Sequence, residues 1–280
     1  MTSLRAIAGL ALLASASIAS AHVSYNNRDF FAAPATFDGV DTYTLTGLRV
    51  ASNFSWADAA DADWGDSHKG RFLKFTLTEE SFVTLSVSAQ NDPGLGLGDL
   101  IPAFSLYSGL IPAASHEGAT APAYLAHHPG FLPGTPYAAE TGKLGDKEGA
   151  WNGLGNFWMA NDNGDAAEVT FIGYAIDGAG VDVNGDRNAQ GQPIIDYAGD
   201  GSANQSVSGT WKLAAGSYTV AVGGACYTCQ YTEDPSTWGS NRVFSASLTL
   251  APVPEPETWA LTGAGLALML LATRGRRAQR

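Results

Sequence analysis

Residues 71–88 read R-F-L-K-F-T-L-T-E-E-S-F-V-T-L-S-V-S. On either side of the Glu79-Glu80 pair, apolar or aromatic residues alternate with polar ones. Successive side chains of a β-strand point to opposite faces, so this alternation is typical of strands with one face buried and one in water. Arg71–Thr78 and Phe82–Ser88 are therefore predicted to be strands joined by a turn at the two glutamates.

The same alternation recurs along most of the chain. Further runs rich in Val, Thr, Phe and Tyr are Thr42–Val50, Ala103–Tyr107, Gly155–Ala160, Glu168–Ala175, Ser206–Leu213, Ser217–Gly223 and Arg242–Leu250. Together, these nine runs predict an all-β fold, a single antiparallel β-sandwich that is jelly-roll-like. The 33 glycines fit a fold with many tight turns.

No clean linker and no internal repeat divides the region between the two chain ends. Residues 22–252 are about the length of one large all-β domain, and we expect them to form one. Within this region, Ser108–Asn156 is rich in Gly, Pro and Ala and is predicted to form loops on the rim of the sandwich.

The N-terminal segment has the features of a secretory signal peptide. Arg5 precedes an apolar run over Ala6–Leu13, and Ala19-Ser20-Ala21 forms an A-x-A cleavage site. Residues 1–21 are therefore predicted to be removed on export, which would leave His22 as the first residue of the mature protein.

The C-terminal segment, residues 253–280, contains three physically different pieces. Pro254 and Pro256 flank Glu255, and prolines at this spacing hold a short extended segment that joins neither helix nor sheet. The run Trp259–Thr273 has no charge and predicts a membrane helix. The arginines that close the chain are Arg274, Arg276, Arg277 and Arg280. An apolar run before such a cluster is a stop-transfer pattern with its basic end in the cytoplasm.

In order, spacing and position, these pieces resemble a PEP-CTERM sorting signal, the substrate tail of bacterial exosortase systems. The resemblance implies transient insertion into the inner membrane, recognition of Pro254, Glu255 and Pro256 by an exosortase, and a final location at the cell surface or outside the cell. The charge-free run covers roughly 22–23 Å, less than the ~30 Å hydrocarbon core. This short span favours processing over the alternative of a permanent single-span anchor.

Two stretches of the body resemble the bacterial pre-peptidase C-terminal type of β-sandwich. They are residues 71–88 and the sequence W-K-L-A-A-G-S-Y-T-V-A-V-G-G that begins at Trp211. A Leu-x-Ala-Gly-x-Tyr-x-Val hairpin recurs in that family, and here it is expected over Trp211–Gly223 with its turn at Ala215-Gly216. The resemblance implies a non-catalytic accessory domain.

The charge balance excludes one class of partner. The net charge of the chain is −12, and without the two terminal signals 25 acidic and 10 basic residues remain. Such a surface repels nucleic acids and anionic membranes, and it stays soluble or collects cations. We therefore expect no nucleic-acid binding.

Cys226 and Cys229, in C-Y-T-C, are the only cysteines. In an exported protein this spacing predicts a local disulfide. A redox dithiol would need a helix N-terminus beside the thiols, and a zinc site would need two further ligands, and neither pattern is evident.

Oxygen-rich loops make Ca²⁺ a candidate cofactor. Asp182, Asn184 and Asp186 place oxygen ligands at alternate positions, and Gly185 permits the bend around a hard cation. The twelfth position is Pro193, which excludes an EF-hand. The alternative is an Asx turn, in which these side chains cap their own backbone.

Two other acidic loops allow the same two interpretations, a cation site or a solvated turn. One is Asn161–Asp165, and the other contains Asp58, Asp61, Asp63 and Asp66.

The search for catalytic motifs supports a protein that is not an enzyme. Neither G-x-S-x-G nor H-E-x-x-H is present. An N-terminal His22 could bind copper with a second histidine, for which His116, His127 and His128 are available.

The sequence thus predicts an exported surface or extracellular-matrix protein with a non-catalytic adhesion or scaffold role towards exopolysaccharide. The alternative is a polysaccharide-binding or polysaccharide-cleaving protein, either copper-dependent through His22 or lectin-like. In the lectin-like case exposed tryptophans would form stacking platforms. The candidates are Trp56, Trp64, Trp151 and Trp238.

Overall fold

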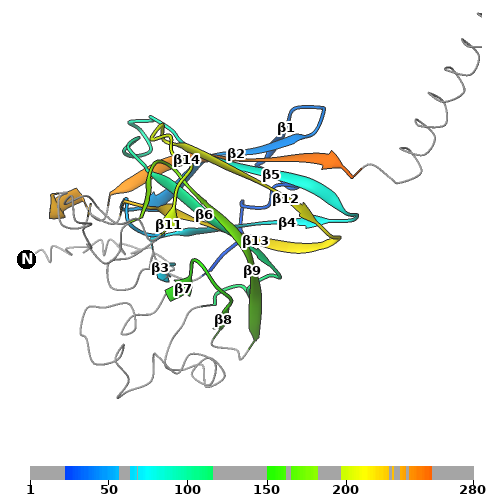
Figure 1. The fold of residues 1–280 in the computed structure, drawn as a ribbon. Coiled ribbons are helices and arrows are strands. Elements are labelled where there is room, and N and C mark those ends of the chain that lie inside the picture. The colour runs from blue at the N-terminus through cyan, green and yellow to red at the C-terminus, as the bar shows by residue number, and fades with distance from the viewer. Residues whose placement is uncertain are drawn as a thin grey trace, which may run out of the picture.

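The computed structural model describes residues 23–56, 64–67, 69–115, 150–161, 165–181, 197–226, 229, 234–237 and 240–253. These residues form two antiparallel sheets of five strands each, packed against one another (Figure 1). The prediction of an all-β sandwich is confirmed. The predicted signal peptide and everything from Pro254 onward lie outside the described residues.

The first sheet has the order β1-β2-β14-β5-β12 and the second the order β4-β13-β6-β9-β8. The first sheet consists of β1 (Thr36–Phe37), β2 (Thr42–Ala51), β14 (Asn241–Pro252), β5 (Ser81–Ala89) and β12 (Ser206–Leu213). The second consists of β4 (Arg71–Leu77), β13 (Gly216–Gly224), β6 (Pro102–Ser108), β9 (Ala166–Ile176) and β8 (Phe157–Ala160).

Each of the nine predicted runs coincides with one of these strands. The strands that sequence patterning missed have only two or three residues, too few for an alternation to be visible. They are β1, β3 (Trp64–Asp66), β7 (Ala150–Asn152), β10 (Gly180–Val181) and β11 (Tyr197–Ala198), and β3 pairs with β7 while β10 pairs with β11. A 3-10 turn, η3, covers Pro235–Thr237.

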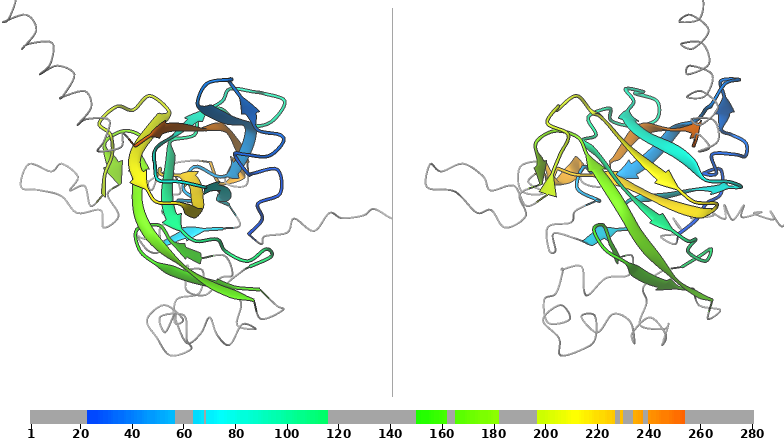
Figure 2. Two further views of the ribbon diagram at one scale, coloured as in Figure 1. Left: turned by 90° about the vertical axis from the view of Figure 1, so that its right-hand side faces the viewer. Right: turned by 45° about the vertical axis from the view of Figure 1, so that its right-hand side comes forward.

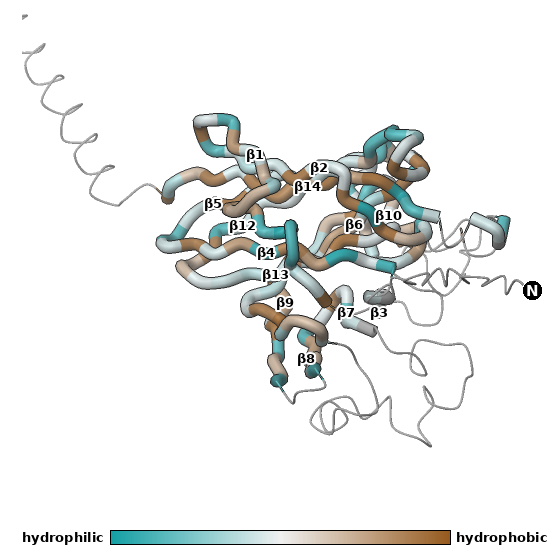
Figure 3. The backbone as a smooth tube through the Cα atoms, turned by 180° about the vertical axis from the view of Figure 1, so that it is seen from behind, coloured by the Kyte–Doolittle hydropathy of each residue, from teal (hydrophilic) through white to brown (hydrophobic). Residues whose placement is uncertain are grey.

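The two sheets face each other (Figure 2), and an inner core of apolar side chains lies between them. The central strand of the first sheet contributes Phe244 and Leu248, which pack with side chains such as Phe104 and Val220 of the second sheet. Inward positions of the first sheet are apolar and outward positions polar, which appears in Figure 3 as alternating colour along its strands. This one-sided burial is what the sequence alternation indicates.

The two predicted strand pairs are not hairpins. β4 and β5, which make up residues 71–88, belong to different sheets, and so do β12 and β13, which contain the expected hairpin Trp211–Gly223. Each turn instead carries the chain across the core from one sheet to the other. The prediction was wrong because two strands that pair side by side and two that pack face to face bury the same alternating side chains.

A second apolar cluster covers the outer face of the second sheet. It contains Trp56, Trp151 and Tyr107, each almost fully buried, together with Phe72 and Phe157. Because β6 is covered on both faces, its residues form a nearly continuous buried run instead of an alternating one. Burial also raises the pKa of Tyr107 well above its usual value.

Part of this cluster comes from the segment Ser108–Asn156, which was expected to form only rim loops. Ala150–Asn152 instead forms β7, and it places Trp151 against Phe72 and Tyr107 with ring centroids 5.8 and 6.5 Å away. A short strand with one large buried side chain gives no periodic signal, which is why the expectation failed.

Candidate functional site

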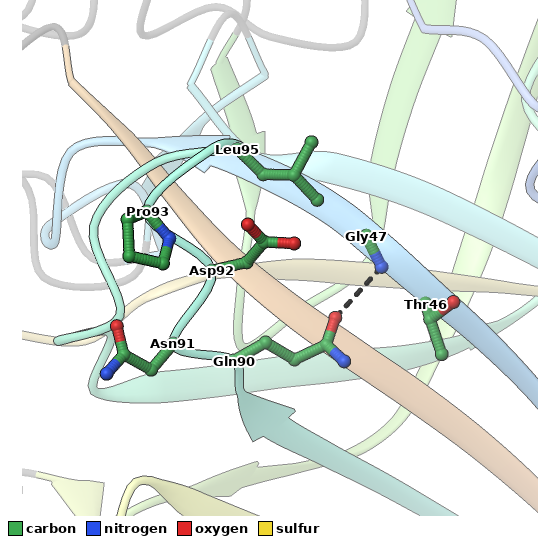
Figure 4. A pocket seen from close by; sticks show the side chains of 7 residues that line it. All are labelled: Thr46, Gly47, Gln90, Asn91, Asp92, Pro93 and Leu95. Carbon is green, nitrogen blue, oxygen red and sulfur yellow. Dashed lines mark hydrogen bonds between the residues drawn. The ribbon is translucent and has the colours of Figure 1, made fainter.

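Two adjoining hollows open beside the loop that follows β5, Gln90–Gly98, which we call the 90–98 loop. The first, of about 480 Å³, is lined by Thr46 and Gly47 of β2 and by loop residues 90–93 and 95 (Figure 4). The second, of about 500 Å³, is lined by loop residues 91, 93 and 96–98 and by Ser240 and Asn241 at the start of β14. Asn91 and Pro93 line both hollows, which therefore adjoin, and we call the two together the groove.

A β-bulge shapes the first hollow. The register between β2 and β14 shifts between Phe244 and Ala246, which leaves Thr46 and Gly47 opposite Ser245. Gly47 adopts a φ of 65°, a conformation that glycine reaches without strain. Its amide donates a hydrogen bond of 2.9 Å to Oε1 of Gln90, whose side chain reaches across β14 to do so. Bulges of this kind re-aim side chains beside binding sites.

The 90–98 loop is fastened to β14 by backbone hydrogen bonds. Leu97 donates to the carbonyl of Asn241 at 2.8 Å and accepts from the amide of Val243 at 3.0 Å. This close approach requires glycine beside it, because a Cβ at Gly96 would lie 2.5 Å from the carbonyl oxygen of Asn241. At the tip, the Asp92 carboxylate accepts a hydrogen bond from the Gly94 amide, which fixes the turn.

A buried arginine holds the end of the loop. Arg242 of β14 is 1% exposed, and its Nε lies 2.6 Å from a carboxylate oxygen of Asp99, whose side chain is largely in solvent. Asp99 directly follows the loop and Arg242 is the second residue of β14, so this ion pair ties the end of the loop to the start of β14.

The groove thus presents side-chain amides, two hydroxyls and the exposed carboxylate of Asp92, together with the apolar side chains of Pro93, Leu95 and Leu97. Amides and hydroxyls donate and accept hydrogen bonds, as sugar hydroxyls do. Among the described residues, no group of three or more His, Cys, Asp or Glu side chains could hold a metal ion. This chemistry suits a neutral polar ligand that lies in an open groove.

Sequence analysis did not single out this groove, although part of it left a signal. A glycine inside a strand pattern, such as Gly47, indicates a bulge. The run P-G-L-G-L-G over residues 93–98 indicates a turn-rich loop. Neither signal predicts that the loop packs against the start of β14. The groove exists because of that contact.

Two of the four tryptophans that were expected to be exposed have described side chains, and both are buried. Trp56 and Trp151 are 1% and 0% exposed, so their predicted role as stacking platforms is wrong. Trp56 donates from Nε1 to Oγ of Ser105 at 2.9 Å, inside the second cluster. These side chains are buried because the second sheet needs a cover on its outer face. The side chains of Trp64 and Trp238 lie outside the described part of the chain.

The remaining candidates are placed as follows. Cys226 and Cys229 form a disulfide with Cα atoms 5.3 Å apart, and the Cys226 amide donates to the carbonyl of Asn53 at 2.8 Å. In the acidic loop Asn161–Asp165, the Asn161 side chain accepts from the Asp165 amide and donates to the Asp165 carboxylate, both at 3.0 Å.

Other predicted residues fall outside the described ranges. These are the calcium candidates Asp182, Asn184 and Asp186, the sorting motif Pro254, Glu255 and Pro256, the arginines of the C-terminal cluster, Asp58, Asp61 and Asp63, and the histidines His22, His116, His127 and His128. The side chain of Asp66 is also outside. No helix in the described ranges is both long and apolar enough to span a bilayer.

Comparison with known proteins gives the following similarities. No family model and no curated protein matches the chain. CorA, a surface-associated copper-binding protein of Methylomicrobium album BG8, aligns with 82% of this chain and 99% of its own, at 14% identity and a TM-score of 0.45. MopE, a secreted copper-binding protein of Methylococcus capsulatus, aligns with 81% of this chain and 87% of its own, at 14% identity and a TM-score of 0.37.

Proposed function

We propose that this chain is an exported surface or extracellular-matrix protein whose β-sandwich associates non-catalytically with exopolysaccharide. The groove at the 90–98 loop carries the proposal. Its two hollows share Asn91 and Pro93, are open to solvent, and are lined by side-chain amides and hydroxyls, the Asp92 carboxylate and apolar side chains. A long polymer must enter a site from the side, so an open groove suits it better than an enclosed pocket.

The strand order supports the same class of function. We infer that the fold is a jelly roll, because β2, β14, β5 and β12 form one sheet while β4, β13, β6 and β9 form the other. This order places the last long strand beside the first, as two nested Greek keys do. Lectin domains are among the proteins that use jelly rolls.

The terminal segments supply the cellular context of the proposal. Residues 1–21 would direct export, and the tail would hold the protein in the inner membrane until an exosortase acts at Pro254, Glu255 and Pro256. The final location is the cell surface or the extracellular space. Calcium remains part of the proposal through Asp182, Asn184 and Asp186, whose oxygens would share one cation.

Replacing Pro254, Glu255 and Pro256 with alanines is expected to trap the full-length protein in the membrane fraction. The uncleaved tail would keep its charge-free run and its arginine cluster, which hold the chain in the bilayer. Fractionation and the mass of the mature protein measure the effect. Glu79→Ala, in an exposed turn, is the control. An unchanged distribution and mass would contradict processing at this motif.

Binding to polymer tests the groove directly. Asn91 lines both hollows, so Asn91→Ala is expected to weaken binding of the exported protein about five- to tenfold, the effect of losing one hydrogen bond of about 1 kcal/mol. Asn91→Trp should abolish binding by filling the groove. Sedimentation with insoluble polysaccharide measures both, and Asn26→Ala at another exposed asparagine is the control. Equal binding by all variants would refute the groove as the site.

A further inference from the structure

The outward face of the first sheet carries a regular array of hydroxyl groups, which we call the hydroxyl face. The strand register places its residues in three rungs that run across β2, β14, β5 and β12. The rungs are Thr42–Thr249–Thr84–Thr210, then Thr44–Ser247–Ser86–Ser208, and then Thr46–Ser245–Ser88–Ser206, with Thr46 in the bulge. Every position in the array is serine or threonine.

The array has the spacing of the sheet itself. Neighbouring strands lie about 4.8 Å apart, and alternate residues along one strand lie about 6.7 Å apart. Hydroxyls on adjacent strands are already linked, for example Thr84 to Thr210 at 2.8 Å and Ser88 to Ser206 at 2.7 Å. Such links fix the side-chain rotamers, while each hydroxyl keeps further hydrogen-bonding capacity. None of the side chains in the three rungs is buried.

The surroundings of the hydroxyl face connect it to the groove. At one end lies Thr46, which also lines the first hollow, beside Gln90 of the loop. At the other end the next rung places Phe82 between Ala251 and Lys212, with Phe82 38% exposed. The groove, the array and an aromatic ring therefore follow one another along a single face of the molecule.

The chemistry of the face narrows the kind of partner. The chain has a net charge of −12, yet the three rungs contain no charged residue, so an ionic partner has nothing to pair with there. The large aromatic side chains that dominate the centres of protein–protein interfaces are also missing from the rungs. What the face offers is a repeated set of neutral donors and acceptors, which complements a surface of repeated neutral hydroxyls.

We propose that the hydroxyl face binds a neutral polysaccharide whose chains run along the strands, from Phe82 over the three rungs and into the groove. This proposal rests on the proposed function and adds the substrate class and the surface. Many weak hydrogen bonds, each formed by a side chain held in place by its neighbour, would act together along the polymer. The exposed ring of Phe82 would pack against a sugar at the far end.

The test uses the exported protein and insoluble polymers of two kinds. Cellulose and curdlan are neutral, and calcium-alginate beads are anionic. The variant Ser208→Lys with Ser247→Lys puts two long cations on the face, and Thr76→Lys puts one on the exposed side of β4 as the control. Ser208→Thr with Ser247→Thr keeps the hydroxyls. Thermal melting confirms that each variant is folded.

We expect the lysine pair to bind a neutral polymer at least tenfold more weakly, while the threonine pair and Thr76→Lys bind like the parent protein. If the lysine pair binds normally and Asn91→Trp does not, the hydroxyl face is not the site and the groove alone remains. Binding of the parent protein to alginate alone would also contradict the proposal that the hydroxyl face binds a neutral polysaccharide. Absence of binding to any of these polymers would instead overturn the proposed function.

Discussion

Replacing Trp56 with alanine is expected to lower the free energy of unfolding of residues 22–252 by about 3–5 kcal/mol. The indole is 1% exposed and packs in the cluster over the second sheet, with its ring centroid 6.0 Å from that of Tyr174. Its Nε1 donates to Oγ of Ser105, so the substitution removes a buried hydrogen bond as well as apolar contacts. Such a loss is a large fraction of the stability of a typical domain.

Denaturant unfolding of the Trp56 variant measures the loss of stability. Polymer binding, measured at a low temperature where the variant is folded, tests whether Trp56 also contacts the ligand. Trp56→Phe should recover part of the stability, because it refills much of the cavity but leaves Ser105 without its donor. A Trp56→Ala variant that melts like the parent protein but loses polymer binding would show that this tryptophan contacts the ligand instead of the core.

A chain that ends at Ser240 is expected not to fold at all, whereas a chain that ends at Val253 folds as the full domain does. The difference between them is β14, which lies at the centre of the first sheet between β2 and β5. Its residues Phe244, Ala246 and Leu248 are buried in the inner core. Removing β14 would expose that core and leave two strands without their backbone partners.

Circular dichroism and thermal melting distinguish the two chains. The shorter one should lack a cooperative transition, and the longer one should melt as the sandwich does in the full-length protein. A cooperative transition in the chain that ends at Ser240 would mean that β2 and β5 can pair without β14.

Local patterning predicted the strands because burial of one face leaves a trace at every second residue. It could not assign strands to sheets, as β12 and β13 demonstrate, since the same inward side chains fit a hairpin or a crossing between sheets. It also could not place Trp56 or Trp151. Their burial depends on a second cluster over the outer face, which is assembled from segments far apart in the sequence.

The hydroxyl face and the groove could not be predicted from the sequence for a related reason. Taken strand by strand, Thr84 or Ser247 is simply a polar residue on a wet face. The rungs appear only when four strands are set in register, with Thr249 between Thr42 and Thr84. The groove likewise needs the 90–98 loop to return to Asn241, a contact between residues about 140 positions apart.

The pairing of β2 with β14 also bears on how fast the domain forms. Thr42 and Thr249 hydrogen-bond to each other although they are 207 positions apart. Closing a loop of about 200 residues costs about 2 kcal/mol more chain entropy than closing one of about 20. Contacts of such long range make folding slow, on the order of milliseconds to seconds. In the proposed export, with the N-terminus first, β2 would emerge early and wait for its partner until nearly the whole chain had crossed. Its unpaired edge is therefore open to pairing with other chains throughout that interval.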